Sequence, residues 1–130
     1  MVNALRAAHR AVRPGGTLID LRPDSAHQPR LLRGRADLGG LVERPIAVGD
    51  NAASDRAVSR LVRAGLIRPI RSGHFWYRFT MPDLAALDEF VETSLRIGRY
   101  GPGARARLAR EPDRPIVIRR ALAYGIYERL

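Results

Sequence analysis

The 130-residue sequence contains no cysteine, and its 23 basic side chains include no lysine. Without cysteine the chain can form neither a disulfide nor a cysteine-ligated zinc site, and its three histidines lack the spacing of metal ligands. We therefore expect no bound metal. No apolar run approaches the roughly 20 residues of a membrane-spanning helix, and no signal-peptide pattern opens the sequence. These absences predict a cytoplasmic protein that does not bind a membrane.

Arginine gives the chain a formal net charge of +10 at pH 7. A basic surface concentrates phosphate groups around it, which makes nucleic acid one candidate partner. An excess of arginine over lysine, together with abundant alanine, glycine, proline and valine, is also what a GC-rich coding sequence produces whatever the function. Charge alone therefore leaves nucleic-acid binding open beside an ordinary solvated arginine surface.

The first 23 residues predict a helix, a glycine turn and a buried strand. Pro14 disfavours helical backbone for the residue before it, and Gly15-Gly16 can adopt the positive φ angles of a helix stop. Thr17–Leu21 is a short apolar run, typical of a strand that a parallel sheet buries on both faces. The helix itself is indicated by apolar residues at helical spacing: Leu5, Ala8 and Val12.

This junction, with the sequence Arg13-Pro14-Gly15-Gly16 before the strand, resembles the one that leads into the fifth strand of class I S-adenosylmethionine-dependent methyltransferases. Arg63–Ile67 is similar, more weakly, to the segment that enters the sixth strand of that family. The resemblance implies an α/β fold: a partial Rossmann-like methyltransferase sheet, corresponding to the C-terminal half, with a β-hairpin and flanking helices. We expect it to form a single domain over residues 1–130.

The same family holds its cofactor with the first strand, a glycine-rich loop and an acidic residue that ends the second strand. In this sequence the later glycine cluster, Gly98–Gly103, follows a predicted helix. The resemblance therefore implies that the cofactor-binding half is missing. We expect the isolated chain to bind no cofactor, and S-adenosylmethionine to be bound only if a partner completes the site.

Two functions follow from the resemblance, and the catalytic residues stay unknown in both. The chain is either a truncated methyltransferase-like domain, non-catalytic or partner-dependent, or an active methyltransferase completed by another chain. Because Thr17–Leu21 would lack its parallel neighbour, its open edge predicts a homodimer or a partner chain. Whether Met1 is the true start, and whether the protein is an enzyme at all, are left open by the sequence.

Residues 24–49 show little periodicity and predict a long irregular connection, with a short strand at Leu41–Val48. The connection leaves the carboxyl end of the strand Thr17–Leu21, the edge at which open α/β sheets bind ligands. This placement makes Arg22, Asp24 and His27 candidates for a substrate-side rim, with an ordinary surface loop as the alternative.

A winged-helix DNA-binding protein is the competing interpretation. A helix over residues 51–64 and two extended runs over residues 66–80, separated by Ser72-Gly73, predict a helix followed by a β-hairpin. This order is similar to the recognition helix and wing of that class. In this interpretation five side chains contact nucleic acid: Arg56, Arg60, Arg63, Arg71 and His74.

Three further elements follow. Pro82 and Asp83 predict the start of a helix with an apolar stripe, because proline is tolerated in the first turn and the helix dipole favours an acidic residue there. A short helix is expected over residues 104–110. Ile116-Val117-Ile118 predicts a final strand that extends to about Tyr127.

Overall fold

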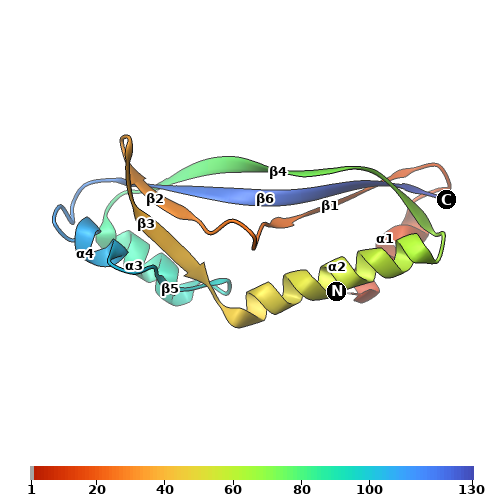
Figure 1. The fold of residues 1–130 in the computed structure, drawn as a ribbon, viewed down its shortest axis with the longest axis horizontal. Coiled ribbons are helices and arrows are strands. Elements are labelled where there is room, and N and C mark those ends of the chain that lie inside the picture. The colour runs from red at the N-terminus through yellow and green to blue at the C-terminus, as the bar shows by residue number, and fades with distance from the viewer. Residues whose placement is uncertain (1) are drawn as a thin grey trace. The chain divides into compact units, whose positions relative to one another are not determined.

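The computed structural model describes residues 2–130, which form a mixed α/β fold with an open, antiparallel six-stranded sheet (Figure 1). The prediction of α/β class with flanking helices is confirmed at this level. In chain order the elements are α1 (Val2–Ala11), β1 (Thr17–Pro23), β2 (Arg30–Arg33), β3 (Ala36–Glu43), α2 (Pro45–Arg63), β4 (Ile67–Met81), α3 (Leu84–Thr93), β5 (Ile97–Tyr100), α4 (Ala104–Leu108) and β6 (Ile116–Arg129).

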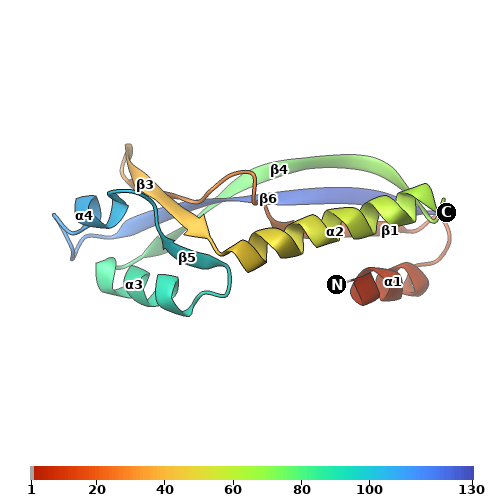
Figure 2. The ribbon, with the colours of Figure 1, turned by 60° about the horizontal axis from the view of Figure 1, so that its bottom comes forward.

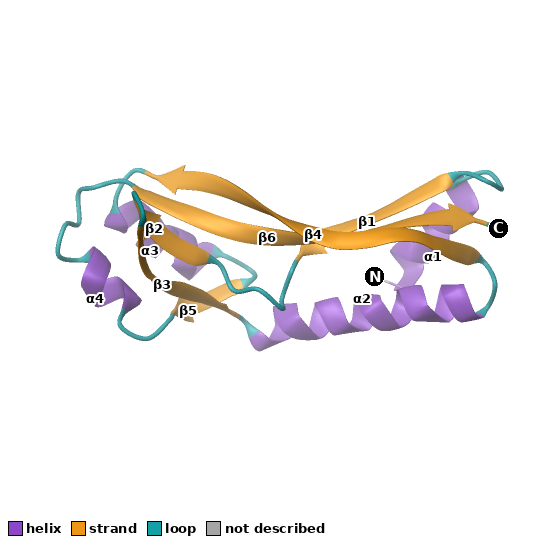
Figure 3. Cartoon of the chain, turned by 45° about the horizontal axis from the view of Figure 1, so that its top comes forward, coloured by secondary structure: helices purple, strands orange, loops and turns teal. Residues whose placement is uncertain are grey.

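Strand β6 has the most partners in the sheet, whose order is β1-β6-β2-β3-β5 with β4 also paired to β6 (Figure 3). Antiparallel pairing joins β6 to β1 from Thr17↔Glu128 to Pro23↔Leu122 without a register shift. The Arg68–Glu128 ion pair lies near one end of β4, and further along it the Arg119 guanidinium stacks on Trp76. These contacts run in opposite directions along the two strands, so β4 is also antiparallel to β6.

The chain divides into two compact units. The first unit comprises the described residues up to Pro23, Gly49–Phe75 and Leu122–Leu130, and the second comprises Asp24–Val48 and Trp76–Ala121. Strands β4 and β6 contribute residues to both units. The expectation of one domain over residues 1–130 stays a prediction.

The predicted helix, glycine turn and strand at the start of the chain are confirmed. Helix α1 ends at Ala11, Gly15 has a φ of 78°, and β1 begins at Thr17. A Cβ atom at Gly16 would lie 2.5 Å from a methyl carbon of Val12, so only glycine fits there. Helices α1 and α2 pack against the strands of the first unit around Leu18, Val58, Leu61 and Ile67 (Figure 2).

The prediction that Thr17–Leu21 is buried on both faces is wrong. Leu18 is buried, but Ile19 and Leu21 are 68% and 55% exposed. The physical reason is that α1 and α2 pack on one face of β1, the face that carries Leu18. Its side chains alternate between the face that packs on the helices and a face that no element of the first unit covers.

The predicted hairpin over residues 66–80 is also wrong, because β4 runs without a turn from Ile67 to Met81. Ser72-Gly73 has the composition of a turn, but Gly73 serves close packing instead. A Cβ atom at Gly73 would lie 3.0 Å from the phenol oxygen of Tyr124, so the tyrosine ring occupies the space that a side chain would need.

The irregular connection expected over residues 24–49 contains two strands and the start of a helix. Strands β2 and β3 pair antiparallel across a tight turn in which Gly34 has a φ of 59°. Helix α2 begins at Pro45, six residues before the predicted start, since proline suits the first position of a helix. The strand expected over Leu41–Val48 therefore ends at Glu43.

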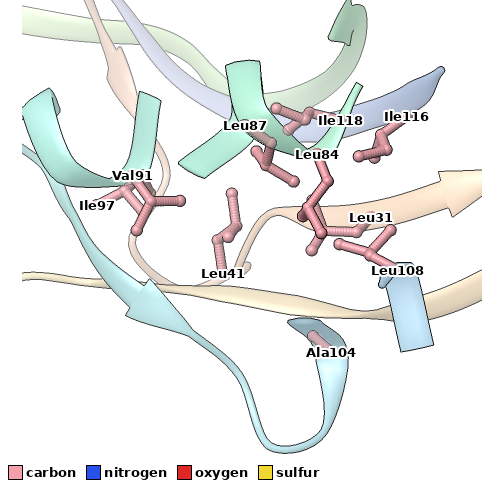
Figure 4. Close-up of a cluster of buried hydrophobic side chains, with 10 residues drawn as sticks. All are labelled: Leu31, Leu41, Leu84, Leu87, Val91, Ile97, Ala104, Leu108, Ile116 and Ile118. Atoms are coloured by element: carbon pink, nitrogen blue, oxygen red, sulfur yellow. The ribbon is translucent and has the colours of Figure 1, made fainter. Parts of the chain in front are cut away.

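The second unit has its own apolar core (Figure 4). Helix α3 begins at Leu84, close to the predicted start, but Pro82 lies before the helix and not in its first turn. Asp83 is the N-cap, and its carboxylate accepts a hydrogen bond of 2.8 Å from the backbone N–H of Ala86. Its apolar face meets residues of β2, β3, α4, β5 and β6. The buried members of this core are Leu31, Leu41, Leu84, Leu87, Val91, Ile97, Ala104, Leu108, Ile116 and Ile118.

Arg33 is a buried arginine of the second unit. The Arg33 side chain donates to four backbone carbonyls at the end of α4 and in the segment that leads from it to β6: those of Leu108 (3.1 Å), Glu111 (2.6 Å), Arg114 (3.0 Å) and Pro115 (3.3 Å). Arg33 is 9% exposed, so these bonds satisfy a charge that would otherwise be buried without partners.

We expect Arg33→Ala to lower the free energy of unfolding by about 3 kcal/mol, because it removes charge-assisted bonds and leaves buried carbonyls unpaired. Chemical denaturation monitored by circular dichroism measures this change. Arg35→Ala is the matched control: Arg35 is exposed on the same turn, and its loss should change stability by less than about 0.5 kcal/mol. Equal effects of the two substitutions would contradict the assigned role of Arg33.

Candidate functional site

A cluster of polar side chains lies at the carboxyl end of β1, in the first unit. The Arg22 guanidinium donates to the backbone carbonyl of Asn51 (2.8 Å) and to the Asp55 carboxylate (2.6 Å) on α2. It also lies 3.0 Å from the Asp20 carboxylate, two residues back on the same face of β1. We call Asp20, Arg22, Asn51 and Asp55 the Arg22 cluster.

Both carboxylates of this cluster contact the same guanidinium, so they do not form an acid–base pair of the kind that general catalysis uses. The Asn51 side-chain amide donates to the Pro23 carbonyl (2.8 Å), which fixes α2 to the end of the strand. The arrangement holds strand and helix together. It presents no nucleophile beside a base.

A cavity of about 240 Å³ lies beside the cluster, between α1, β1 and α2. Its walls are mostly apolar, and its polar lining residues are Asp20, Ser54 and Tyr127. Three alanines, Ala4, Ala8 and Ala57, line it, and their small side chains leave the space unfilled. The sequence did not predict the cavity, because alanine has a high helix propensity and its presence in a helix does not by itself indicate an unfilled space.

Tyr127 of β6 lines the same cavity. Its ring lies over Gly125, where a Cβ atom would collide with the phenol. Burial raises the pKa of Tyr127 above its ordinary value, and the negative charge of Asp20 adds to this shift. The phenol is therefore neutral at physiological pH.

Of the three rim residues, the structure brings Asp24 and His27 together, while Arg22 belongs to the cluster in the first unit. His27 Nδ1 lies 2.7 Å from an Asp24 carboxylate oxygen, and the other oxygen accepts a bond of 2.9 Å from the backbone N–H of Ala26. The His27 ring meets the Trp76 ring edge-on, with centroids 5.5 Å apart, and Arg119 stacks on Trp76 at 4.3 Å. Sequence reasoning missed this stack because alternating aromatic residues indicate sheet core.

The five residues assigned to nucleic acid are all exposed, but they do not form a recognition helix with a wing. The wing is absent because β4 is continuous, which removes the structural basis of the winged-helix interpretation. Arg63 and Arg71 line one hollow of about 510 Å³, together with Ser72. Arg56 lies exposed on α2 and His74 lies exposed on β4.

A second basic hollow, of about 420 Å³, joins Arg60 of α2 to Arg6 and Arg10 of α1. Residues 6 and 10 are four apart in the helix, so their side chains lie on one face. This spacing is the signal from which the sequence could have predicted the hollow. Its charge suits phosphate groups, but nothing in its geometry reads base edges.

The first glycine of the cluster Gly98–Gly103 lies inside β5 and does not follow a helix directly, contrary to the sequence prediction, because α3 already ends at Thr93. Strand β5 ends at Tyr100, and α4 begins at Ala104 after Gly101-Pro102-Gly103. The order strand, glycine loop, helix is that of a phosphate-binding turn, yet Gly101 packs on β3. Its N–H donates to the Gly40 carbonyl (2.7 Å), and a Cβ atom there would lie 3.0 Å from that oxygen. The glycines therefore permit close backbone packing.

Comparisons of the chain with protein-family models, with curated proteins and with solved structures find no match. Over the described residues, no helix has both the length and the apolar character needed to cross a membrane.

We expect the exposed arginines to give weak binding of duplex DNA that is salt-sensitive and shows no preference among sequences. Arg60→Ala should weaken binding to unrelated duplexes by the same factor and reduce the slope of log K against log salt by about 1. Fluorescence anisotropy at several salt concentrations measures both quantities. A loss of affinity confined to one preferred sequence would contradict this expectation and would support the recognition of bases by Arg60.

Proposed function

We propose that the chain is a methyltransferase-like domain that does not catalyse methyl transfer alone and acts through a partner. The observation that carries the proposal is the unpaired edge of strand β1. This strand follows the Pro14-Gly15-Gly16 turn that resembles the family's entry to its fifth strand, and one of its edges has no partner strand among the described residues. A sheet edge of this kind takes up further strands.

The arrangement around β6 supports a partial Rossmann-like sheet. By the resemblance, β1 and β4 correspond to the fifth and sixth strands. Both are antiparallel to β6 and pair with it, so they run parallel to each other with β6 between them. Doubly wound sheets often include an antiparallel strand, and the helix α2 between β1 and β4 packs on their shared face. The antiparallel strands β2, β3 and β5 are additions to this scheme.

The chemistry within each of the two units supports a domain that binds no cofactor alone. A cofactor of this family needs free backbone amides after a strand and a carboxylate for the ribose hydroxyls. The N–H of Gly101 is bonded to Gly40, and the carboxylates of Asp20 and Asp55 contact Arg22. An active methyltransferase is the alternative if the partner supplies the cofactor loop, with S-adenosylmethionine bound on the partner's side.

Calorimetric titration of the isolated chain with S-adenosylmethionine tests the proposal, and we expect no measurable heat of binding. A dissociation constant near 1 μM, equivalent to roughly −8 kcal/mol, would overturn it. Asp20→Asn is the companion variant. If heat is observed and this substitution abolishes it, the first unit contains a cofactor site of its own.

A further inference from the structure

The strand β1 exposes a short, symmetric row of backbone groups at its free edge. Arg129 N–H donates to the Gly16 carbonyl (2.9 Å), and the pairing of β1 with β6 continues from there without a shift. Backbone groups alternate between the two edges of a strand. The N–H and C=O groups of Leu18, Asp20 and Arg22 therefore point toward β6, and those of Thr17, Ile19 and Leu21 point away from it.

Both ends of this row are closed. Pro23 has no N–H, and its carbonyl already accepts the Asn51 side-chain amide (2.8 Å). At the other end the chain turns at Gly15, which has a φ of 78°. The segment available for pairing is thus Thr17–Leu21, and its midpoint is Ile19.

We propose that this edge pairs with the same edge of a second copy, antiparallel and centred on Ile19. The proposal rests on the proposed function and names its partner. In this register Ile19 lies opposite Ile19 of the second copy, and Thr17 lies opposite Leu21. Every outward-pointing residue then meets another outward-pointing residue, so the hydrogen-bonding groups of the two edges are complementary.

Side chains and charge fit the same register. Ile19 and Leu21, which are 68% and 55% exposed, lie on one face and continue onto the equivalent residues of the second copy. The segment contains one charged residue, Asp20, whose carboxylate lies 3.0 Å from Arg22. Pairing two copies of a chain with a net charge of +10 at this point therefore brings no uncompensated positive charge into the interface.

A register centred on Leu21 is less favourable. It would place Ile19 opposite Pro23, which cannot donate a hydrogen bond and whose carbonyl is bonded to Asn51. A register centred on Asp20 would set the two carboxylates directly opposite each other, which is destabilising. The Ile19-centred register avoids both costs.

The absence of native cysteine makes single-cysteine cross-linking a clean test. Ile19→Cys should give a disulfide-linked dimer under mild oxidation, since Cα atoms in a hydrogen-bonded antiparallel pair are about 5.5 Å apart, within disulfide range. Thr17→Cys and Leu21→Cys are the matched controls. Equivalent residues at these positions would be about 13 Å apart along the strand, so neither variant should cross-link alone. A mixture of the two should form the mixed disulfide.

Sedimentation equilibrium of the unmodified protein at micromolar concentration gives an independent readout, for which we expect a dimer. Ile19→Lys should make it monomeric, because a charge on an edge strand opposes pairing. Ile70→Lys, at a site on β4 that is 56% exposed, should leave the dimer intact.

A monomeric unmodified protein, or cross-linking of Leu21→Cys in place of Ile19→Cys, would overturn the proposal. Either result leaves the proposed function standing, since that function depends on the titration with S-adenosylmethionine and not on the identity of the partner.

Discussion

The pairing of β6 with its neighbours is the interaction on which the rest of the structure depends. Strand β6 provides backbone partners for β1, β2 and β4, so its 14 residues connect segments from the beginning, middle and end of the sequence. Most of these pairs are far apart in sequence, and their loop-closure entropy must be offset by the apolar burial in the core of each unit. Gly73 and Gly125 permit close packing in this part of the sheet, because a tyrosine ring occupies the space that a side chain would need at each position.

The arginine-rich composition is used inside each unit as well as on the surface. Arg33 binds backbone carbonyls, and Arg22 binds the carboxylates of Asp20 on β1 and Asp55 on α2. In the second unit, the hydrogen bond from Arg105 holds the pKa of Asp88 below its ordinary value, and burial raises that of the Tyr100 phenol, which donates to Asp88 (2.6 Å). The net charge of +10 therefore overstates the charge available to a polyanionic ligand.

The sequence predicted those elements that depend on residues close together in the chain. The glycine turn before β1, the start of α3 next to Pro82 and Asp83, and the apolar run that opens β6 each depend on a few neighbouring residues, and each is confirmed. The hairpin at Ser72-Gly73 failed because a glycine serves a turn and a close approach equally well, and the Tyr124 ring that requires it lies 51 positions later in the sequence. Strand β2 and the first part of β3 were missed for a similar reason, since Leu31 becomes core only beside α3 and α4.

In the candidate site, too, the sequence predicted what depends on neighbouring residues and missed what depends on tertiary contacts. Arg22 was predicted from its position at the end of a strand, but its partners Asn51 and Asp55 come from a helix that packs there through tertiary contacts. The edge of β1 was predicted to be open, yet its usable length depends on the Asn51 amide that occupies the Pro23 carbonyl. One helix contact thus both completes the polar cluster and limits the free edge to Thr17–Leu21. For this reason the cluster, which has no catalytic arrangement of its own, still bears on function: it determines which backbone groups of β1 a partner strand can reach.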